Sequence, residues 1–228
     1  MYLLIPAAGM GKRMGSNRNK LLLLLRGEPL ISWTLQAAEA ASAINWIGII
    51  SQPSDWSDLK MILANLQLSK PVSLIHGGET RQESVYNGLQ ALPEDAQKVL
   101  IHDGARCLAT PDLFNRCAQA LQKTPGLIAA VPVKDTIKVV DKSGIIQSTP
   151  DRSQLWAAQT PQGFDVKLLK QCHDKGVSQG WQVTDDAALF EKCGLKVQVV
   201  EGEETNLKVT TPQDLAIAEF ILKSRISG

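Results

Sequence analysis

The sequence predicts an α/β fold in which helices cover both faces of a mostly parallel sheet. Short apolar, β-branched runs alternate with longer segments of helical period, and no internal repeat or low-complexity linker interrupts them. Because helices separate the strands, the strands are expected to run in the same direction and to be covered on both faces. With 228 residues, 44% of them hydrophobic, the chain can bury one large core, so we expect a single domain over residues 1–228.

The elements follow one another in a regular order. The predicted strands are LLIP (3–6), WIGII (46–50), VSLI (72–75), VLI (99–101), LIAAVPV (127–133) and KVQVV (196–200). Several of the predicted helices begin with Ser, Thr, Asp or Pro, which are typical of a helix start; they lie at about 29–42, 55–68, 80–92, 111–124, 184–193 and 212–224.

Glycine and polar residues collect where these strands end. The first strand runs into a glycine loop, the third into Gly77-Gly78-Glu79, the fourth into Asp103, and the fifth into Lys134-Asp135-Thr136. In open α/β sheets ligands bind outside the carboxyl ends of the strands. The sequence therefore predicts a substrate cleft along this edge of the sheet.

One segment, TIKVVDKSGIIQST (136–149), breaks the alternation. It reads as a β-hairpin whose Asp-Lys-Ser-Gly turn places Gly144 where a positive φ is needed. An isolated hairpin is marginally stable, yet this one carries five β-branched apolar residues, so we expect it to pack on something. A second subunit is one candidate, and the hairpin's own domain is the other.

The charge distribution points to a small anionic ligand. The net charge of +1 and the pI near 7.7 argue against a nucleic-acid-binding surface, which usually shows a marked basic excess. The opening segment is different: no carboxylate precedes Glu28, and the basic residues there are Lys12, Arg13, Arg18, Lys20 and Arg26. A small, highly charged ligand would suit this segment.

Cysteine usage and hydropathy indicate in which cellular compartment the protein is expected. The four cysteines form no CxxC pair and show no metal-ligand spacing with the three histidines, which favours free thiols in a reducing compartment. No run approaches the length of a membrane span, and a strand beginning at residue 3 leaves no room for a targeting peptide. We expect a cytoplasmic protein without a membrane partner; a mature plastid form would look the same.

The glycine loop that follows the first strand fails the tests for both familiar phosphate-binding loops. A Walker loop needs Ser or Thr after Gly-Lys, but Arg13 follows Lys12, and a dinucleotide fingerprint needs glycine where Met14 stands. The second failure argues against an NAD-dependent enzyme. What remains is a strand followed by small residues and bases, which fits backbone contacts to phosphate and equally a tight turn with solvated bases.

For other candidate residues, the sequence also allows both a functional and a purely structural interpretation. Asp103 could bind Mg²⁺ or cap the next turn. Thr80 and Glu83 have the spacing of a capping box, which opens a helix whether or not the preceding Gly78 meets a ligand. Thr184 starts a segment that looks first like a helix N-cap, and Lys208 precedes a helix begun by proline, where a solvated lysine is the default.

Taken together, the motifs of the whole chain resemble one enzyme family. They are PAAGMGKRMG…NK (6–20), GGETRQESV (77–85), HDGAR (102–106), VKDTIK (133–138), DRSQLWAAQTPQ (151–162), TDDAA (184–188) and NLKVTTPQDLAIAE (206–219). They look like 2-C-methyl-D-erythritol 4-phosphate cytidylyltransferase of non-mevalonate isoprenoid biosynthesis. The resemblance implies a Rossmann-like nucleotidyltransferase fold, a β-arm at about 136–157 that forms a homodimer, and Mg²⁺-dependent conversion of CTP and methylerythritol phosphate to the cytidyl diphosphate product and pyrophosphate.

The resemblance also implies roles for individual residues. The residues expected at the nucleotide are Ala7, Ala8, Gly9, Gly11, Gly78, Glu79, Arg81, Ser84 and Asp103, with Asp103 also near the metal. Those expected to stabilise charge or to aim the attacking phosphate are Arg13, Lys20, Arg152 and Lys208. Those expected around the methylerythritol phosphate are Arg106, Thr136, Thr160 and Thr184. Because Arg152 follows the hairpin, in a dimer it would reach the neighbouring subunit's site.

The sequence departs from the family pattern at three positions. Asn19 stands where the family usually has proline before the loop lysine, and we expect it to loosen the loop; Gly104 and Cys107 replace Ala and Pro. None of these changes removes a charge, so the reaction class stands. The nearest rival is ribitol-5-phosphate cytidylyltransferase, which the Ala7-Ala8-Gly9 loop and Asp151-Arg152 disfavour; a non-catalytic nucleotide-binding module is another alternative.

Overall fold

The fold is built on a seven-stranded sheet in which only one strand is antiparallel to its neighbours. The computed structural model describes residues 1–9 and 19–227. The spatial order of the strands is β11 (Gln198–Glu201), β7 (Gly126–Pro132), β10 (Trp156–Asp165), β6 (Lys98–Ile101), β1 (Tyr2–Pro6), β4 (Trp46–Ser51) and β5 (Val72–His76). Strand β10 runs antiparallel to β6 and β7, and the other pairs are parallel. The predicted α/β class is confirmed.

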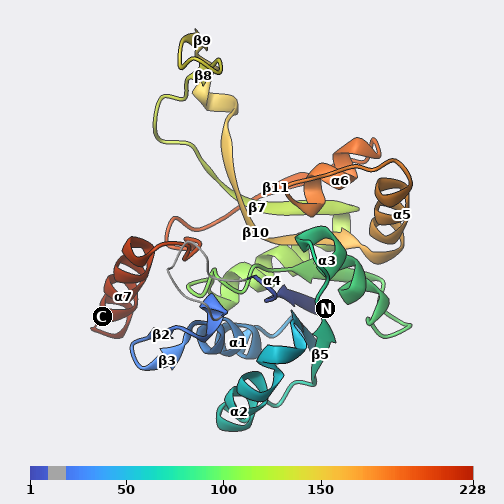
Figure 1. Cartoon of the computed structure of the whole chain (residues 1–228), viewed down its shortest axis with the longest axis vertical. Helices are drawn as coiled ribbons and strands as arrows, with labels where there is room; N and C mark the ends of the chain where they lie inside the picture. Colours follow the sequence, from blue (N-terminus) through green and yellow to red (C-terminus); the bar gives the residue numbers. More distant parts are fainter. Residues whose placement is uncertain (10–18, 228) are drawn as a thin grey trace.

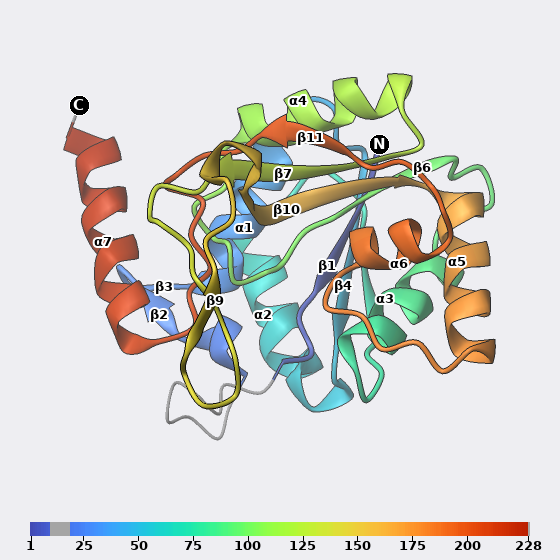
Figure 2. The same cartoon turned by 90° about the horizontal axis from the view of Figure 1, so that it is seen from above.

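Helices cover both faces of this sheet, as Figure 2 shows. Side chains alternate along β1, so Leu3 and Ile5 pack in one buried cluster and Leu4 packs in another. The first cluster includes residues of α1 (Leu30–Ala40), α2 (Trp56–Leu66) and α4 (Pro111–Ala120). The second includes residues of α3 (Arg81–Gln90), α5 (Val166–Ser178) and α6 (Asp186–Lys192). This two-sided core holds the strand ends at fixed positions.

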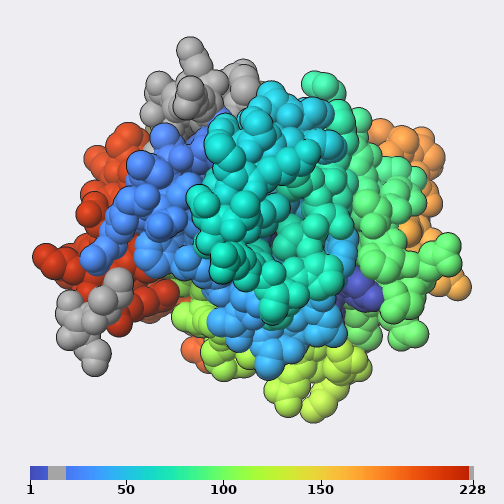
Figure 3. Space-filling model, turned by 90° about the horizontal axis from the view of Figure 1, so that it is seen from below, coloured from blue at the N-terminus to red at the C-terminus, as the bar shows by residue number. Residues whose placement is uncertain are grey.

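A third, smaller cluster attaches the last helix. Helix α7 (Pro212–Ser227) packs beside the short strand pair β2 (Leu24–Leu25) and β3 (Glu28–Pro29), with Cys107 buried among them. In Figure 3, the red atoms of α7 and the orange atoms of α5 lie at opposite edges of the molecule, with α2 between them. Within the described ranges 1–9 and 19–227, no helix combines the length and the apolar character needed to cross a membrane.

The six predicted strands and six predicted helices are all present, but β10 and α5 were not predicted. The stretch Gln159–Gln162 lacks apolar alternation, and the pairing of β10 with β7 shifts register there. Residues 162–164 pair with β6 on one side and β7 on the other, and this pairing makes the segment part of a buried strand despite its composition. Helix α5 carried a readable signal, because Asp165 accepts a hydrogen bond from the Leu168 amide at 3.0 Å as an N-cap.

The predicted hairpin is confirmed and projects away from the sheet (Figure 1). It contains β8 (Val139–Val140) and β9 (Ile146–Ser148), joined through Gly144 at a φ of +85°. Every residue from 134 to 149 is exposed. The alternative in which the hairpin folds back on its own domain is therefore wrong, and we call residues 136–157 the arm.

Candidate active site

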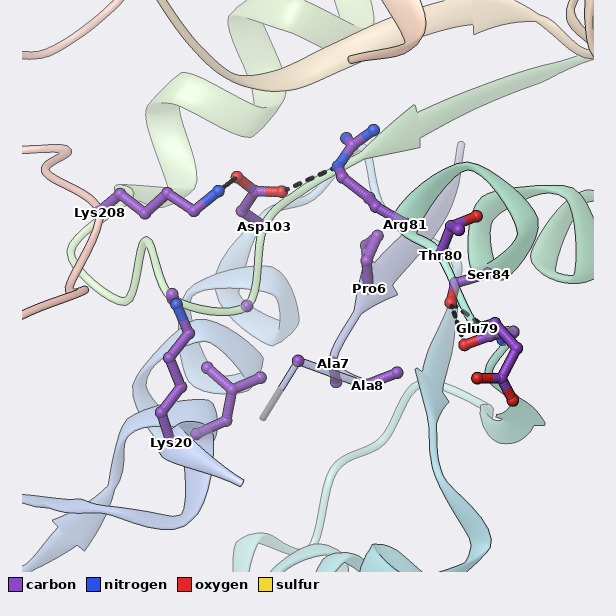
Figure 4. A pocket seen from close by; sticks show the side chains of 15 residues that line it. Pro6, Ala7, Ala8, Lys20, Glu79, Thr80, Arg81, Ser84, Asp103 and Lys208 are labelled. Carbon is purple, nitrogen blue, oxygen red and sulfur yellow. Dashed lines mark hydrogen bonds and ion pairs between the residues drawn. The ribbon is translucent and has the colours of Figure 1, made fainter. Parts of the chain in front are cut away.

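A pocket lies at the carboxyl ends of the central parallel strands, where the sequence predicted a cleft. The segments that follow β1, β5 and β6 form its walls, and Lys20 and Lys208 lie on the side opposite Glu79 and Ser84 (Figure 4). Many of the predicted site residues line it: Ala7, Ala8, Gly9, Lys20, Gly78, Glu79, Arg81, Ser84, Asp103 and Lys208. Gly11 and Arg13, which the resemblance also places at the site, lie outside the described residues.

Asp103 is held in place by the strand next to its own. Its backbone amide donates to Oγ1 of Thr160 on β10 at 3.0 Å, and that oxygen lies 3.0 Å from Nδ1 of His102. The Arg106 carbonyl can only accept, so His102 Nε2 carries the ring proton and donates to it at 3.1 Å. In the neutral ring, Nδ1 then accepts the proton of the Thr160 hydroxyl. Burial lowers the pKa of His102 to about 4, so a neutral ring completes this network.

The Asp103 carboxylate is shared by two cations. Its oxygens lie 2.6 Å from Lys208 Nζ and 3.6 Å from Arg81 Nε (Figure 4). Burial raises the pKa of this carboxyl, but the charges of Lys208 and Arg81 outweigh burial and leave the pKa at about 2. Asp103 is therefore ionised at neutral pH. Arg81 is in turn held by the buried Asp186, whose Oδ2 accepts from Nη1 at 2.8 Å.

The segment from Gly78 to Ser84 is an N-terminal helix cap that faces the pocket. Thr80 accepts from the Glu83 amide at 3.1 Å, and Glu83 accepts from the Glu79 amide at 2.8 Å. The predicted capping box is thus confirmed, although the Glu83 side chain reaches the residue before the cap. Ser84 Oγ accepts from the Gly78 amide at 3.0 Å, and a Cβ at Gly78 would overlap the Glu83 side chain. Glycine is required here for close packing.

Lys20 faces the other side of the pocket. It is the first residue of the 3₁₀-helix η2 (Lys20–Leu22), and its Nζ donates to the Val209 carbonyl at 3.3 Å. Figure 4 shows Lys20 and Glu79 on opposite sides of Ala7 and Ala8. The pocket thus brings Lys20, Arg81 and Lys208 together around small residues, an arrangement that suits a polyphosphate.

Five predicted site residues within the described ranges do not line this pocket. Thr160 lies beneath Asp103, and Arg106 donates to the carbonyls of Asn206 at 2.7 Å and Ala158 at 3.3 Å. These contacts tie β10 to the segment that carries Lys208. The other three are exposed: Thr184 lies before α6, and Thr136 and Arg152 lie on the arm. Their substrate roles stay predictions.

Comparison with known proteins agrees with the geometry. The family model of 2-C-methyl-D-erythritol 4-phosphate cytidylyltransferase matches residues 1–224. The chain belongs to this family. Enzymes of that name from Nostoc punctiforme and Crocosphaera subtropica are 79% and 72% identical over 225 and 227 residues, with at least 99% of each chain covered. Among solved structures, 4-diphosphocytidyl-2C-methyl-D-erythritol synthase from Anaerococcus prevotii is 33% identical with a TM-score of 0.88, covering 97% of both chains.

Membership of the cytidylyltransferase family accounts for the quoted motifs, but two buried residues within them were missed. In the sequence Asn206 stands out only as part of the motif that contains Lys208, but in the structure its Nδ2 donates to the Thr160 carbonyl at 2.8 Å and to Gln159 Oε1 at 3.1 Å. Asp186 was read as part of an N-cap. The cap is Asp185, which accepts from the Ala188 amide at 3.0 Å, while Asp186 is buried against Arg81. The signal in the sequence for this role of Asp186 is that a second aspartate directly follows the N-cap residue Asp185.

Proposed function

We propose that this chain transfers the cytidylyl group of CTP to 2-C-methyl-D-erythritol 4-phosphate. An oxygen of the methylerythritol phosphate attacks the α-phosphorus, the bond from that phosphorus to the β-phosphate oxygen breaks, and pyrophosphate leaves. The observation that carries the proposal is the pocket at the carboxyl ends of parallel strands, where Lys208 and Arg81 contact Asp103 and Lys20 lines the same cavity. Family membership supplies the two substrates.

The barrier to this reaction is electrostatic, because both reactants are anions. Attack by a phosphate needs no protein nucleophile, so the useful groups are cations that hold the reacting phosphates in line. In this proposal Lys20 stabilises the negative charge that develops on the transferring phosphate and on pyrophosphate. Arg13 shares this role. Lys208 releases Asp103 and takes the acceptor phosphate, since its Nζ can exchange one anionic partner for another.

A magnesium ion fits this pocket only together with the nucleotide. Among residues 1–9 and 19–227, no group of three or more His, Cys, Asp or Glu side chains could hold a metal alone. Protein-bound Mg²⁺ commonly uses one or two carboxylates plus substrate phosphates, and Asp103 offers an ionised carboxylate. Bound there, Mg²⁺ would neutralise phosphate charge as a Lewis acid. Arg81, held by Asp186, keeps the carboxylate oriented.

The arm supplies the remaining part of the proposal. Its exposed apolar side chains include Val140, Ile145 and Ile146, which are more than half exposed in the single chain. Such a surface favours pairing with a second copy, and we propose a homodimer in which Arg152 reaches the neighbouring pocket. The four free cysteines, three of them buried, support a cytoplasmic location.

Pyrophosphate release tests the reaction directly. With CTP, Mg²⁺ and methylerythritol phosphate we expect turnover, and with ribitol 5-phosphate we expect little. Preferential use of ribitol 5-phosphate would support the rival enzyme, and CTP binding without turnover on either acceptor would support a nucleotide-binding module. Chelation by EDTA should abolish turnover; activity that persists in EDTA would contradict the magnesium assignment.

A further inference from the structure

The side chain of Asn19 connects three parts of the molecule that meet behind the pocket. It is 6% exposed, and its Nδ2 donates to the Ala7 carbonyl at 2.6 Å and to Asp55 Oδ2 at 2.8 Å. Its Oδ1 accepts from the Leu21 amide at 3.0 Å, which caps η2. Both amide hydrogens and the carbonyl oxygen are therefore used.

The orientation of this amide is fixed by its partners. The carbonyl of Ala7 and the carboxylate of Asp55 can only accept, and the Leu21 amide can only donate. Exchange of Oδ1 and Nδ2 would lose all three bonds. An asparagine satisfies the site, whereas an aspartate would place a second carboxylate beside Asp55 and leave the Ala7 carbonyl without this donor.

These bonds place Lys20 relative to the sheet. Ala7 follows β1, and its amide donates to the Ile50 carbonyl on β4 at 2.6 Å. Asp55 ends the 3₁₀-helix η3 (Pro53–Asp55), which follows β4. Through Asn19, the first turn of η2 is thus fastened to the ends of two adjacent strands. The side chain of Leu21 is 3% exposed and fixes the same turn from the core side.

We propose that Asn19 is a positioning residue for Lys20 and that Asp55 is its partner in this role. The inference rests on the proposed function, because it takes Lys20 as the group that stabilises charge in the transition state. The φ of Asn19 is −57°, within the range of proline, so proline can reproduce this backbone angle but none of the three side-chain bonds. In this chain the turn that carries Lys20 is therefore held by side-chain hydrogen bonds, and Asp55 makes one of them.

A pair of substitutions tests the assignment. Asn19→Asp brings two carboxylates together, and we expect kcat to fall about 10²-fold with little change in the KM for either substrate, as for a displaced catalytic group. Adding Asp55→Asn gives residue 55 an amide that can donate to the introduced carboxylate, so the double variant should recover much of the loss. Asn65→Asp, the same change at an exposed position on α2, serves as the control and should leave kcat unchanged.

Two further measurements separate positioning from folding and from the reaction. Asp55→Ala keeps Asn19 and should lower kcat, and combining it with Asn19→Ala should cost less than the product of the single effects. Hydrogen exchange at the Leu21 amide should speed up in Asn19→Ala regardless of activity, so it tests the bonds even if wild-type protein fails to use CTP. Wild-type kcat in Asn19→Asp, or no recovery with Asp55→Asn, would overturn the proposal.

Discussion

The pocket and the arm are opposite in construction. In the pocket, charged side chains hold one another: Asp103 is held by Lys208 and Arg81, and Arg81 by the buried Asp186. On the arm, Arg152 donates to the Lys134 carbonyl at 2.7 Å, and both residues are exposed. The arm presents apolar side chains to solvent, while the pocket is fixed by the sheet beneath it.

This difference shows which part of the active site one chain can organise by itself. The strand ends set the nucleotide side of the pocket before any ligand arrives, since their positions follow from a two-sided core. The arm has no comparable support, so its contribution to the acceptor depends on what covers its apolar surface. Substitutions in the two regions should therefore differ in kind as well as in size.

The largest effect is expected in the pocket, at Lys20. Lys20→Ala should lower kcat by about 10²- to 10³-fold, the usual loss for one preorganised electrostatic group, because the charge on the transferring phosphate loses a partner. Steady-state pyrophosphate release on folded protein measures it. Lys60→Ala, at an exposed position on α2, is the matched control. Unchanged turnover in Lys20→Ala would remove Lys20 from the mechanism.

A smaller effect, of a different kind, is expected on the arm. Arg152→Ala should raise the KM for methylerythritol phosphate by roughly 10- to 10²-fold, as expected for one charge-assisted hydrogen bond, and leave CTP binding unchanged. If Arg152 serves the neighbouring pocket, mixing Arg152→Ala with Lys20→Ala chains should restore activity by forming one complete site. Weakened CTP binding alone, or no restoration on mixing, would place Arg152 elsewhere.

The two regions also differ in how far the sequence predicts them. Apolar periodicity located twelve elements and the hairpin, and the rule for strand ends placed Asp103 in the pocket, because these features depend on local pattern. Contacts between distant segments were out of reach: Arg81 and Asp186 are 105 residues apart. The loosening expected from Asn19 is not found at that residue, which is buried with three side-chain hydrogen bonds, because sequence does not show where an amide points.

Acid should weaken the pocket more than the arm. The pKa of Asp103 is depressed from 3.8 to about 2, so its stabilising contribution is present above pH 4 and is lost as the pH falls through 2. By linkage this amounts to on the order of 2 kcal/mol. The stability difference between wild type and Asp103→Asn, followed by denaturant unfolding, should therefore shrink from pH 5 to pH 2. A constant difference would mean that Asp103 is not stabilised by Lys208 and Arg81.

The smallest effects should come from two glycines, one in each region. A Cβ at Gly104 would lie 2.7 Å from Leu21 Cδ1 and 3.1 Å from Ile5 Cγ2, so Gly104→Ala overpacks the wall beside η2. We expect a loss of about 1 kcal/mol, at the low end for overpacking because Leu21 can shift its terminal methyl, and a fall in Tm of about 2–4 °C.

Gly144 is the matched comparison on the arm. A Cβ there meets nothing within 4 Å, but its φ of +85° strains any other residue. Gly144→Ala should cost about 1 kcal/mol within the turn alone, because left-handed backbone disfavours a side chain. Since the arm stands apart from the core, calorimetry on the isolated chain should show an unchanged Tm. An equal fall in Tm for both variants would mean that arm and pocket unfold as one unit, which the exposed hairpin argues against.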